Sequence, residues 1–313
     1  MPLKKQKYIF GPVPSRRLGI SLGVDIVPFK TCSLDCIYCQ IGKSPEKTIE
    51  RKQYTPIDDV LGELKEKLVA GTKADFITIS GSGEPTLHSR LGELIDGIKI
   101  LTGIPVAVIT NGTLFYMPDV RADCAKADVV VPSLDAGDEE VFQRINRPHP
   151  QLSMEKLIDG LCQFRKQYSG RMWLEVFFIE GVNNTAGTIA KIKSAIELIG
   201  PDKVQLNTAV RPTAERGVKK LQAEQLQAIA LQLGGNAEVI ADFSDSRCSG
   251  HADGKSGDIL LLLKRRPCSL SDICSGLDIG RDEALKYVAD LVRQGVVGSE
   301  ERDGTVFFTA NVT

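Results

Sequence analysis

The feature that most constrains the fold of this chain is an alternation of short apolar runs with longer amphipathic stretches between about residues 20 and 245. The apolar runs, rich in Val, Ile and Phe, predict strands that are buried on both faces. Because strand and helix alternate six times, we expect parallel strands joined by right-handed crossover helices, either as an open doubly wound sheet or as a curved partial barrel. Strands are expected at 21–27, 74–80, 105–110, 128–133, 172–179 and 203–208, and helices at 57–70, 90–102, 118–125, 138–145, 153–168 and 186–199.

The composition bounds the class of protein. With 313 residues, the chain is long enough for one large domain and one small one. Its 39 basic and 40 acidic side chains nearly cancel, so no global field attracts nucleic acid or an anionic membrane. The sequence shows no secretory signal and no apolar run of the roughly 18 residues that a membrane span needs. We therefore predict a cytoplasmic protein whose eight cysteines serve metal or redox chemistry.

The last quarter of the chain predicts a separate small domain. A stretch rich in Ser, Asp and Gly at 246–257 is expected to link a large domain, 1–245, to a small one, 258–313. The small domain predicts three short helices, with Ser269 or Ser271 capping the second, and a β-hairpin around Asp303-Gly304. This order is typical of a winged helix.

Winged helices commonly bind DNA, but the charge of the small domain argues against it. It carries seven basic and nine acidic residues, and Asp282, Glu283 and Asp290 lie on the third helix, which would read the groove. We therefore expect DNA binding to be absent and the domain to contact protein or present substrate. Lys264-Arg265-Arg266 forms a small basic patch that is suited to RNA.

Three cysteines follow the first predicted strand within eight residues. In TCSLDCIYCQ, Cys32, Cys36 and Cys39 are spaced Cys-x3-Cys-x2-Cys. Thiols at this density on a loop indicate a metal site. A structural zinc ion is the alternative, but it normally needs a fourth nearby Cys or His, which this segment lacks. Three thiolates on a four-iron cluster leave one iron without a protein ligand, where chemistry can occur.

This spacing, with Tyr38 before the last cysteine, resembles the cluster motif of the radical S-adenosylmethionine (SAM) superfamily. The resemblance covers roughly residues 8–245 and implies a partial (β/α)6 TIM-type barrel with a [4Fe-4S] cluster as a cofactor. It also implies that SAM binds the open iron and is cleaved reductively to a 5′-deoxyadenosyl radical that abstracts a substrate hydrogen. An electron donor such as flavodoxin or ferredoxin is the implied partner.

Four further segments resemble the SAM-binding elements of that superfamily, and each follows the carboxyl end of a predicted strand, where parallel α/β folds assemble their sites. SGSGEPTL at 80–87 resembles the Gly-Gly-Glu element that binds the SAM ammonium, although Ser82 replaces one glycine. TNGTL at 110–114 and PSLDA at 132–136 resemble the segments along the ribose and carboxylate, and FFIEGVNN at 177–184 resembles the adenine-binding segment. The resemblance implies SAM binding by Gly81, Gly83, Glu84, Asn111, Ser133, Asp135 and Ile179, with Gly181 and Tyr38 near the adenine.

The substrate is less sharply indicated. YIFGPVPSRRLGISLG at 8–23 resembles the branch that contains the wyosine-type tRNA-modifying enzymes, but the second cysteine cluster of those enzymes is absent, because no cysteine precedes Cys32. We expect a tRNA base or another macromolecule, including protein, rather than a small metabolite. Candidate substrate-binding residues are Arg16 and Arg17, which suit a carboxylate or phosphate, and Glu175, Asn207 and Arg211, which lie in or just after strands.

Two alternatives stay open at this point. The chain could be a non-catalytic iron–sulfur redox sensor whose winged-helix tail binds DNA or a regulatory protein. Cys248 and His251 could form a second metal or redox site, although a coincidence within a polar loop is the simpler interpretation. The sequence gives no indication of the oligomeric state.

Overall fold

The computed structural model describes residues 8–44, 46–241, 255–277 and 279–311. Its main feature is an eight-stranded sheet with the strands in sequence order from β1 to β8. The first strand is antiparallel to the second, and all later neighbours are parallel. The strands are β1 (Ile9–Ser15), β2 (Gly19–Val24), β3 (Phe76–Ile79), β4 (Val106–Thr110), β5 (Val129–Pro132), β6 (Arg171–Phe178), β7 (Lys203–Thr208) and β8 (Ala237–Val239).

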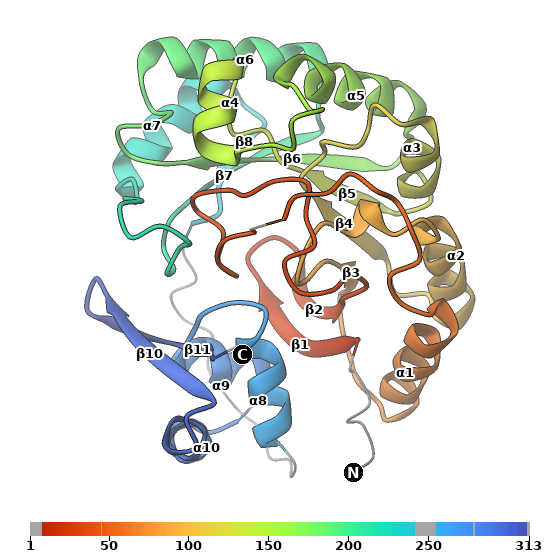
Figure 1. Ribbon diagram of the computed structural model, residues 1–313, viewed down its shortest axis with the longest axis vertical. Coiled ribbons are helices and arrows are strands. Elements are labelled where there is room, and N and C mark those ends of the chain that lie inside the picture. Colours follow the sequence, from red (N-terminus) through yellow and green to blue (C-terminus); the bar gives the residue numbers. More distant parts are fainter. Residues whose placement is uncertain (1–7, 45, 242–254, 278, 312–313) are drawn as a thin grey trace.

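Helices cover the outer face of this sheet, which curves into a partial barrel (Figure 1). Alternate strand residues, such as Leu174 and Val176 of β6, belong to the core between sheet and helices. The helices are α1 (Ile57–Val69), α2 (Leu91–Leu101), α3 (Pro118–Cys124), α4 (Glu139–Asn146), α5 (Met154–Gln167), α6 (Ala186–Ile199) and α7 (Ala223–Leu233), with a short 3₁₀ turn, η1 (Pro85–Leu87), after β3. The predicted partial barrel is confirmed.

The structure contains three elements of the sheet region that the sequence pattern did not predict: β1, β8 and α7. Strand β1 contains Pro12 and Pro14, which read as a turn, yet proline is tolerated because β1 is at the sheet edge. Strand β8 has only three residues, too few for a recognisable apolar run. The predicted six parallel strands are therefore seven, with one antiparallel strand added.

The turn between β1 and β2 closes the interior of the barrel. Leu18 is buried against Ala107, Val129, Val131 and Trp173, which alternate with the helix-facing residues of β4, β5 and β6. These apolar side chains form a buried cluster that fills the barrel interior below the carboxyl ends of the strands. Arg16 and Arg17 directly precede Leu18 in this turn, so the buried cluster fixes the position of the turn that carries them.

The small C-terminal domain has the predicted order of three helices and a hairpin. It consists of α8 (Lys255–Leu263), β9 (Cys268–Ser269), α9 (Leu270–Leu277), α10 (Arg281–Arg293), β10 (Val297–Arg302) and β11 (Thr305–Ala310). Helix α8 begins at Lys255, so the last three residues of the predicted linker are helical instead. The hairpin turns at Asp303 and Gly304, which both have positive φ angles, as a type I′ turn requires.

The small domain packs on the first hairpin of the barrel. Phe10 and Val13 of β1 share an apolar core with Ile259, Leu262 and other buried residues of α8 to β11. The domain therefore lies beside β1 and β2 in Figure 1. At the start of α9, the Ser269 hydroxyl accepts a hydrogen bond from the Asp272 amide and the Asp272 carboxylate accepts one from the Ser269 amide, so Ser269 is the cap. Among the described residues, no helix is both long enough and apolar enough to cross a membrane.

Candidate functional site: a cysteine and arginine cavity at the strand ends

The three cysteines of the predicted cluster lie on the long loop between β2 and α1 and line one cavity of about 400 Å³. The amide of Asn111 donates to Sγ of Cys32 over 3.5 Å, and the amide of Asn146 donates to Sγ of Cys36 over 3.4 Å. Burial is the main cause that raises the pKa of all three thiols, to about 12 for Cys32. Iron binding would replace these protons.

The three cysteine thiols suit an iron–sulfur cluster. A four-iron cluster takes each thiolate on a separate iron, and hydrogen bonds such as those from Asn111 and Asn146 to the sulfurs tune its reduction potential. The residues present therefore fit a [4Fe-4S] cluster held by Cys32, Cys36 and Cys39.

Glu84 lies behind the cavity wall. Its buried carboxylate accepts hydrogen bonds from the Thr86 amide and hydroxyl, the Thr110 hydroxyl and, over 2.7 Å, the Asn111 amide. Burial raises the pKa of Glu84, and these hydrogen bonds oppose the rise. The carboxylate joins the loops after β3 and β4, and it does not line the cavity. Its predicted contact with the SAM ammonium stays a prediction.

The glycines Gly81 and Gly83 do line the cavity, and packing explains both. A Cβ atom at Gly83 would lie 2.0 Å from the Thr31 carbonyl oxygen of the cysteine loop. Gly81 has a φ of +153°, and a Cβ atom there would lie 2.4 Å from Cγ of Asp25. Only glycine allows this close approach of the two loops.

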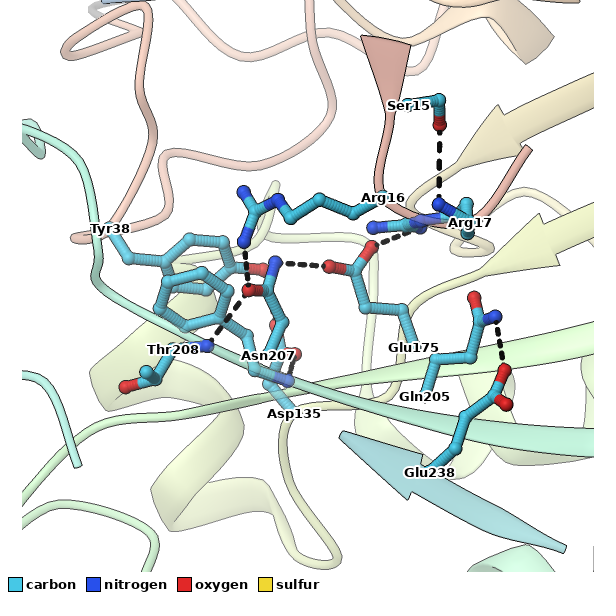
Figure 2. A network of polar contacts seen from close by, with 11 residues as sticks. Ser15, Arg16, Arg17, Tyr38, Asp135, Glu175, Gln205, Asn207, Thr208 and Glu238 are labelled. Atoms are coloured by element: carbon cyan, nitrogen blue, oxygen red, sulfur yellow. Dashed lines mark hydrogen bonds and ion pairs between the residues drawn. The ribbon is translucent and has the colours of Figure 1, made fainter. Parts of the chain in front are cut away.

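Asp135 organises the wall below Tyr38. Its carboxylate accepts hydrogen bonds from the Tyr38 hydroxyl, the Asn146 amide and the Phe177 backbone amide. The Tyr38 ring, labelled with Asp135 in Figure 2, stacks on Phe177 with centroids 4.0 Å apart. Tyr38 and Phe177 both line the cavity. Burial raises the pKa of Asp135 to about 6, although the Tyr38 and Asn146 hydrogen bonds act in the opposite direction.

Three other predicted SAM residues also lie outside the cavity lining. Ser133 pairs with Glu175 in an isolated bridge, Ile179 is buried in the apolar cluster that includes Phe177, and Asn111 lies between Glu84 and Cys32. At the exit of β6, Asn183 accepts from the Ile179 amide and donates to the carbonyls of Asp135 and Phe177. Gly181, nearby, has a φ of +72°.

All five candidate substrate residues line the same cavity as the cysteines. Arg17 forms an ion pair with Glu175 at 2.7 Å, and Glu175 also accepts a hydrogen bond from Asn207. Arg16 donates to Asn207 over 2.8 Å, as Figure 2 shows, so the β1–β2 turn is joined to β6 and β7 across the interior. Burial alone would raise the pKa of Glu175, but Arg17, Asn207 and Arg16 together lower it, so Glu175 is ionised at neutral pH. Their role in substrate binding stays a prediction.

The sequence pattern missed several residues of the site. Asp25 holds Ser82 through the backbone amide and the hydroxyl, and it pairs with Arg265 of the small domain at 2.9 Å. Arg265 and Arg266, singled out in the sequence only as a basic patch, both line the cavity. Asn146 and Asn183 were not singled out by any sequence motif. Cys248 and His251 lie outside the described residues.

Comparison with known proteins agrees with this geometry. The family model described as the radical SAM superfamily matches residues 26–190. A UPF0026 protein of Methanocaldococcus jannaschii is 32% identical over 97% of this chain and 96% of its own length. A protein of Brachyspira hyodysenteriae named GTPase Obg is 37% identical over 98% of this chain, but the chain spans only 46% of that relative.

Among solved structures, the one titled "Structure of TYW1 with a lysine-pyruvate adduct bound" aligns with a TM-score of 0.54 at 21% identity, covering 72% of this chain and 75% of that one. A radical SAM methyltransferase from Sphaerobacter thermophilus aligns with a TM-score of 0.52 at 16% identity over 70% of this chain and 65% of its own. These two likenesses concern the fold. The family model and the UPF0026 relative show that the chain belongs to the radical SAM superfamily, within its UPF0026 group.

Proposed function

We propose that this enzyme abstracts a hydrogen atom from a substrate bound in the cysteine and arginine cavity. The observation that carries the proposal is that Cys32, Cys36 and Cys39 line the same cavity as the five candidate substrate residues. As a radical SAM enzyme it uses a [4Fe-4S] cluster and SAM, which together supply a 5′-deoxyadenosyl radical. A substrate held by Arg16, Asn207 or Arg211 would face the cluster within one enclosure.

The chain's own residues supply orientation and exclusion of water, because the cofactors carry the reactive chemistry. Gly81, Gly83 and Tyr38 present backbone and ring surface on the cysteine side, where SAM is expected. Asn111 and Asn146 hold two of the sulfurs in place, and Leu18 closes the interior from below. A fixed position for the reacting hydrogen is the main contribution that a protein makes to such a reaction.

For the substrate we favour a tRNA base or another macromolecule. The support is the resemblance of residues 8–23 to the wyosine branch and the position of the Lys264-Arg265-Arg266 patch, two members of which line the cavity. Flavodoxin or ferredoxin is the proposed electron donor. Acidic residues on α10 continue to argue against DNA, and membership of an enzyme superfamily disfavours the non-catalytic redox sensor.

Formation of 5′-deoxyadenosine tests the proposal. The protein would be purified without oxygen, loaded with iron and sulfide, reduced with dithionite and mixed with SAM. We expect 5′-deoxyadenosine from the wild type and from a Cys162→Ala control, whose thiol lies on α5 away from the cavity. A variant with Cys32, Cys36 and Cys39 all changed to alanine should form none. Iron binding without SAM cleavage by the wild type would contradict the proposal.

A further inference from the structure

Five arginines from three separate parts of the chain meet at the cavity. Arg16 and Arg17 come from the β1–β2 turn, Arg211 follows β7, and Arg265 and Arg266 follow α8 of the small domain. The small domain therefore contributes part of the cavity wall. Such a convergence is costly unless other charges offset it.

Among the described residues, carboxylates pair with three of the five arginines. Arg17 pairs with Glu175, Arg211 with Asp272 and Arg265 with Asp25. Within the described part of the chain, Arg16 and Arg266 have no ion-pair partner. The acceptors of Arg16 among the described residues are uncharged, namely the Asn207 side chain and the Ala241 carbonyl oxygen. Two of the five arginines are thus left without a carboxylate partner in the described part of the chain.

Arg266 is the more informative of the two. Its Nε and Nη2 atoms are buried and have no hydrogen-bond partner among the described residues. Native proteins rarely bury charged donors without partners, because the lost hydration is not replaced. A guanidinium in this state at the wall of a cavity is suited to a ligand that accepts hydrogen bonds.

The electrostatic environment of Arg16 also favours an anionic ligand in this part of the cavity. Burial, and next the charges of Arg211 and Arg17, lower the pKa of Arg16 to about 9. Positive charges are therefore crowded in this part of the cavity, and an anion would relieve their mutual repulsion.

We propose that Arg16 and Arg266, with Arg211 beside them, bind a phosphate group of the substrate, so that the small domain completes the substrate site. A phosphate monoester carries about −1.5 to −2 charges at neutral pH, which suits two arginines without carboxylate partners better than a single carboxylate does. The planar fork of arginine also fits phosphate oxygens. The inference rests on the proposed function insofar as the phosphate belongs to the substrate.

Inorganic phosphate is the probe for this site. The cluster-loaded protein, without oxygen and without SAM, would be titrated calorimetrically with phosphate and separately with acetate at matched ionic strength. Three proteins would be compared: the wild type, Arg266→Gln, and Arg293→Gln, which removes the same charge from an exposed ion pair on α10. Phosphate binding needs neither cluster reduction nor SAM cleavage, so the two proposals fail separately.

We expect phosphate to bind the wild type and Arg293→Gln equally, and to bind Arg266→Gln about 10-fold or more weakly. In buffer without phosphate, Arg266→Gln should melt at a higher temperature than the wild type, because it removes two buried donors that have no hydrogen-bond partner and the repulsion between Arg266 and Arg16. A purely structural arginine would give the opposite shift.

Four results would overturn the proposal: no phosphate binding, acetate binding as tight as phosphate binding, unchanged phosphate affinity in Arg266→Gln, or a lower melting temperature for that variant. If the wild type fails to bind phosphate and Arg266→Gln instead weakens SAM binding, the arginines serve the SAM carboxylate. That outcome also overturns the proposal.

Discussion

At the scale of single residues, Glu84 belongs to a predicted SAM-binding motif, yet its carboxylate stabilises the fold by accepting hydrogen bonds from the chain itself. Both of its carboxylate oxygens are engaged by the chain itself, through Thr86 and Thr110 on one oxygen and the Asn111 amide on the other. The loop after β4 therefore depends on Glu84 for its position. Asn111 in turn donates to Cys32, so the carboxylate indirectly orients a cluster ligand.

Replacement of Glu84 by glutamine should destabilise the protein even without SAM. The glutamine NH₂ group would face a backbone donor, either the Thr86 amide or the Asn111 amide, and leave it unsatisfied in a buried position. We expect a loss of about 1–3 kcal/mol in the free energy of unfolding, measured by urea denaturation of the protein without SAM. Unchanged stability with weakened SAM binding would show instead that Glu84 acts mainly on the ammonium.

At the scale of elements, Asp272 connects α9 of the small domain to the loop after β7. It pairs with Arg211 at 2.9 Å and closes the cap of its own helix through Ser269. Burial alone would raise the pKa of Asp272, but the charges of Arg211 and Arg266 and the hydrogen bond from the Ser269 amide together lower the pKa from its ordinary value. Because the folded pKa is depressed, the ionised carboxylate stabilises the fold above the unfolded value and this stabilisation is lost in acid.

The Asp272→Asn variant tests this contribution. At pH 7 we expect it to lose about 1.5–3 kcal/mol in the free energy of unfolding, the usual value of a hydrogen-bonded charge. As the pH falls below about 4, the difference from the wild type should narrow, because the unfolded wild-type chain then binds a proton at Asp272 more readily than the folded protein does. Chemical denaturation of both proteins at pH 7, 5 and 3.5 would measure this difference in the free energy of unfolding. A difference that is constant with pH would contradict the role of the charge.

At the scale of the whole molecule, a buried ion pair joins the small domain to the end of β2 and, through it, to the predicted SAM-binding segment at 80–87. Arg265 and Asp25 have side chains only 8% and 6% exposed, and Asp25 also holds Ser82 after β3. With Arg266 in the cavity wall, the small domain is part of the site rather than an appendage. Its stability and that of the barrel should therefore be coupled.

Removing one partner of the Arg265–Asp25 pair should lower the free energy of unfolding substantially. We expect Arg265→Ala to lose about 3–5 kcal/mol in the free energy of unfolding, because it leaves Asp25 as an uncompensated buried charge. Asp25→Ala should behave similarly, and the double variant should lose less than the sum of the two, as a double-mutant cycle would show. Additive losses would mean that the two charges do not interact. Arg293→Ala, in an exposed pair, should change stability by less than about 1 kcal/mol.

Much of this architecture is encoded locally and could be predicted. The strand and helix alternation predicted a parallel sheet with crossover helices, and the resemblance of the motifs to the radical SAM superfamily favoured the barrel over an open sheet. The positive-φ turn at Asp303-Gly304 follows from residues that favour it. The cysteine spacing identified three residues that indeed face one cavity. These features depend on neighbours in sequence, which is why a single chain reveals them.

The missed features depend on contacts between distant parts of the chain. Asp25 and Arg265 are 240 residues apart, and only the fold brings them together. The placement of Glu84 and Asp135 behind the cavity wall could not be read from their motifs, because a motif does not show which way a side chain points. Strand β1 was hidden by Pro12 and Pro14, whose presence is allowed only by its edge position.

The central claim is that three cysteines hold a cluster with one iron open to SAM, and electron paramagnetic resonance tests it most directly. The anaerobically loaded, dithionite-reduced protein should show the signal of a reduced [4Fe-4S] cluster, and SAM should change that signal. The variant lacking Cys32, Cys36 and Cys39 should show no such signal. A wild-type signal that does not respond to SAM, or a protein that binds zinc and no iron, would contradict the account.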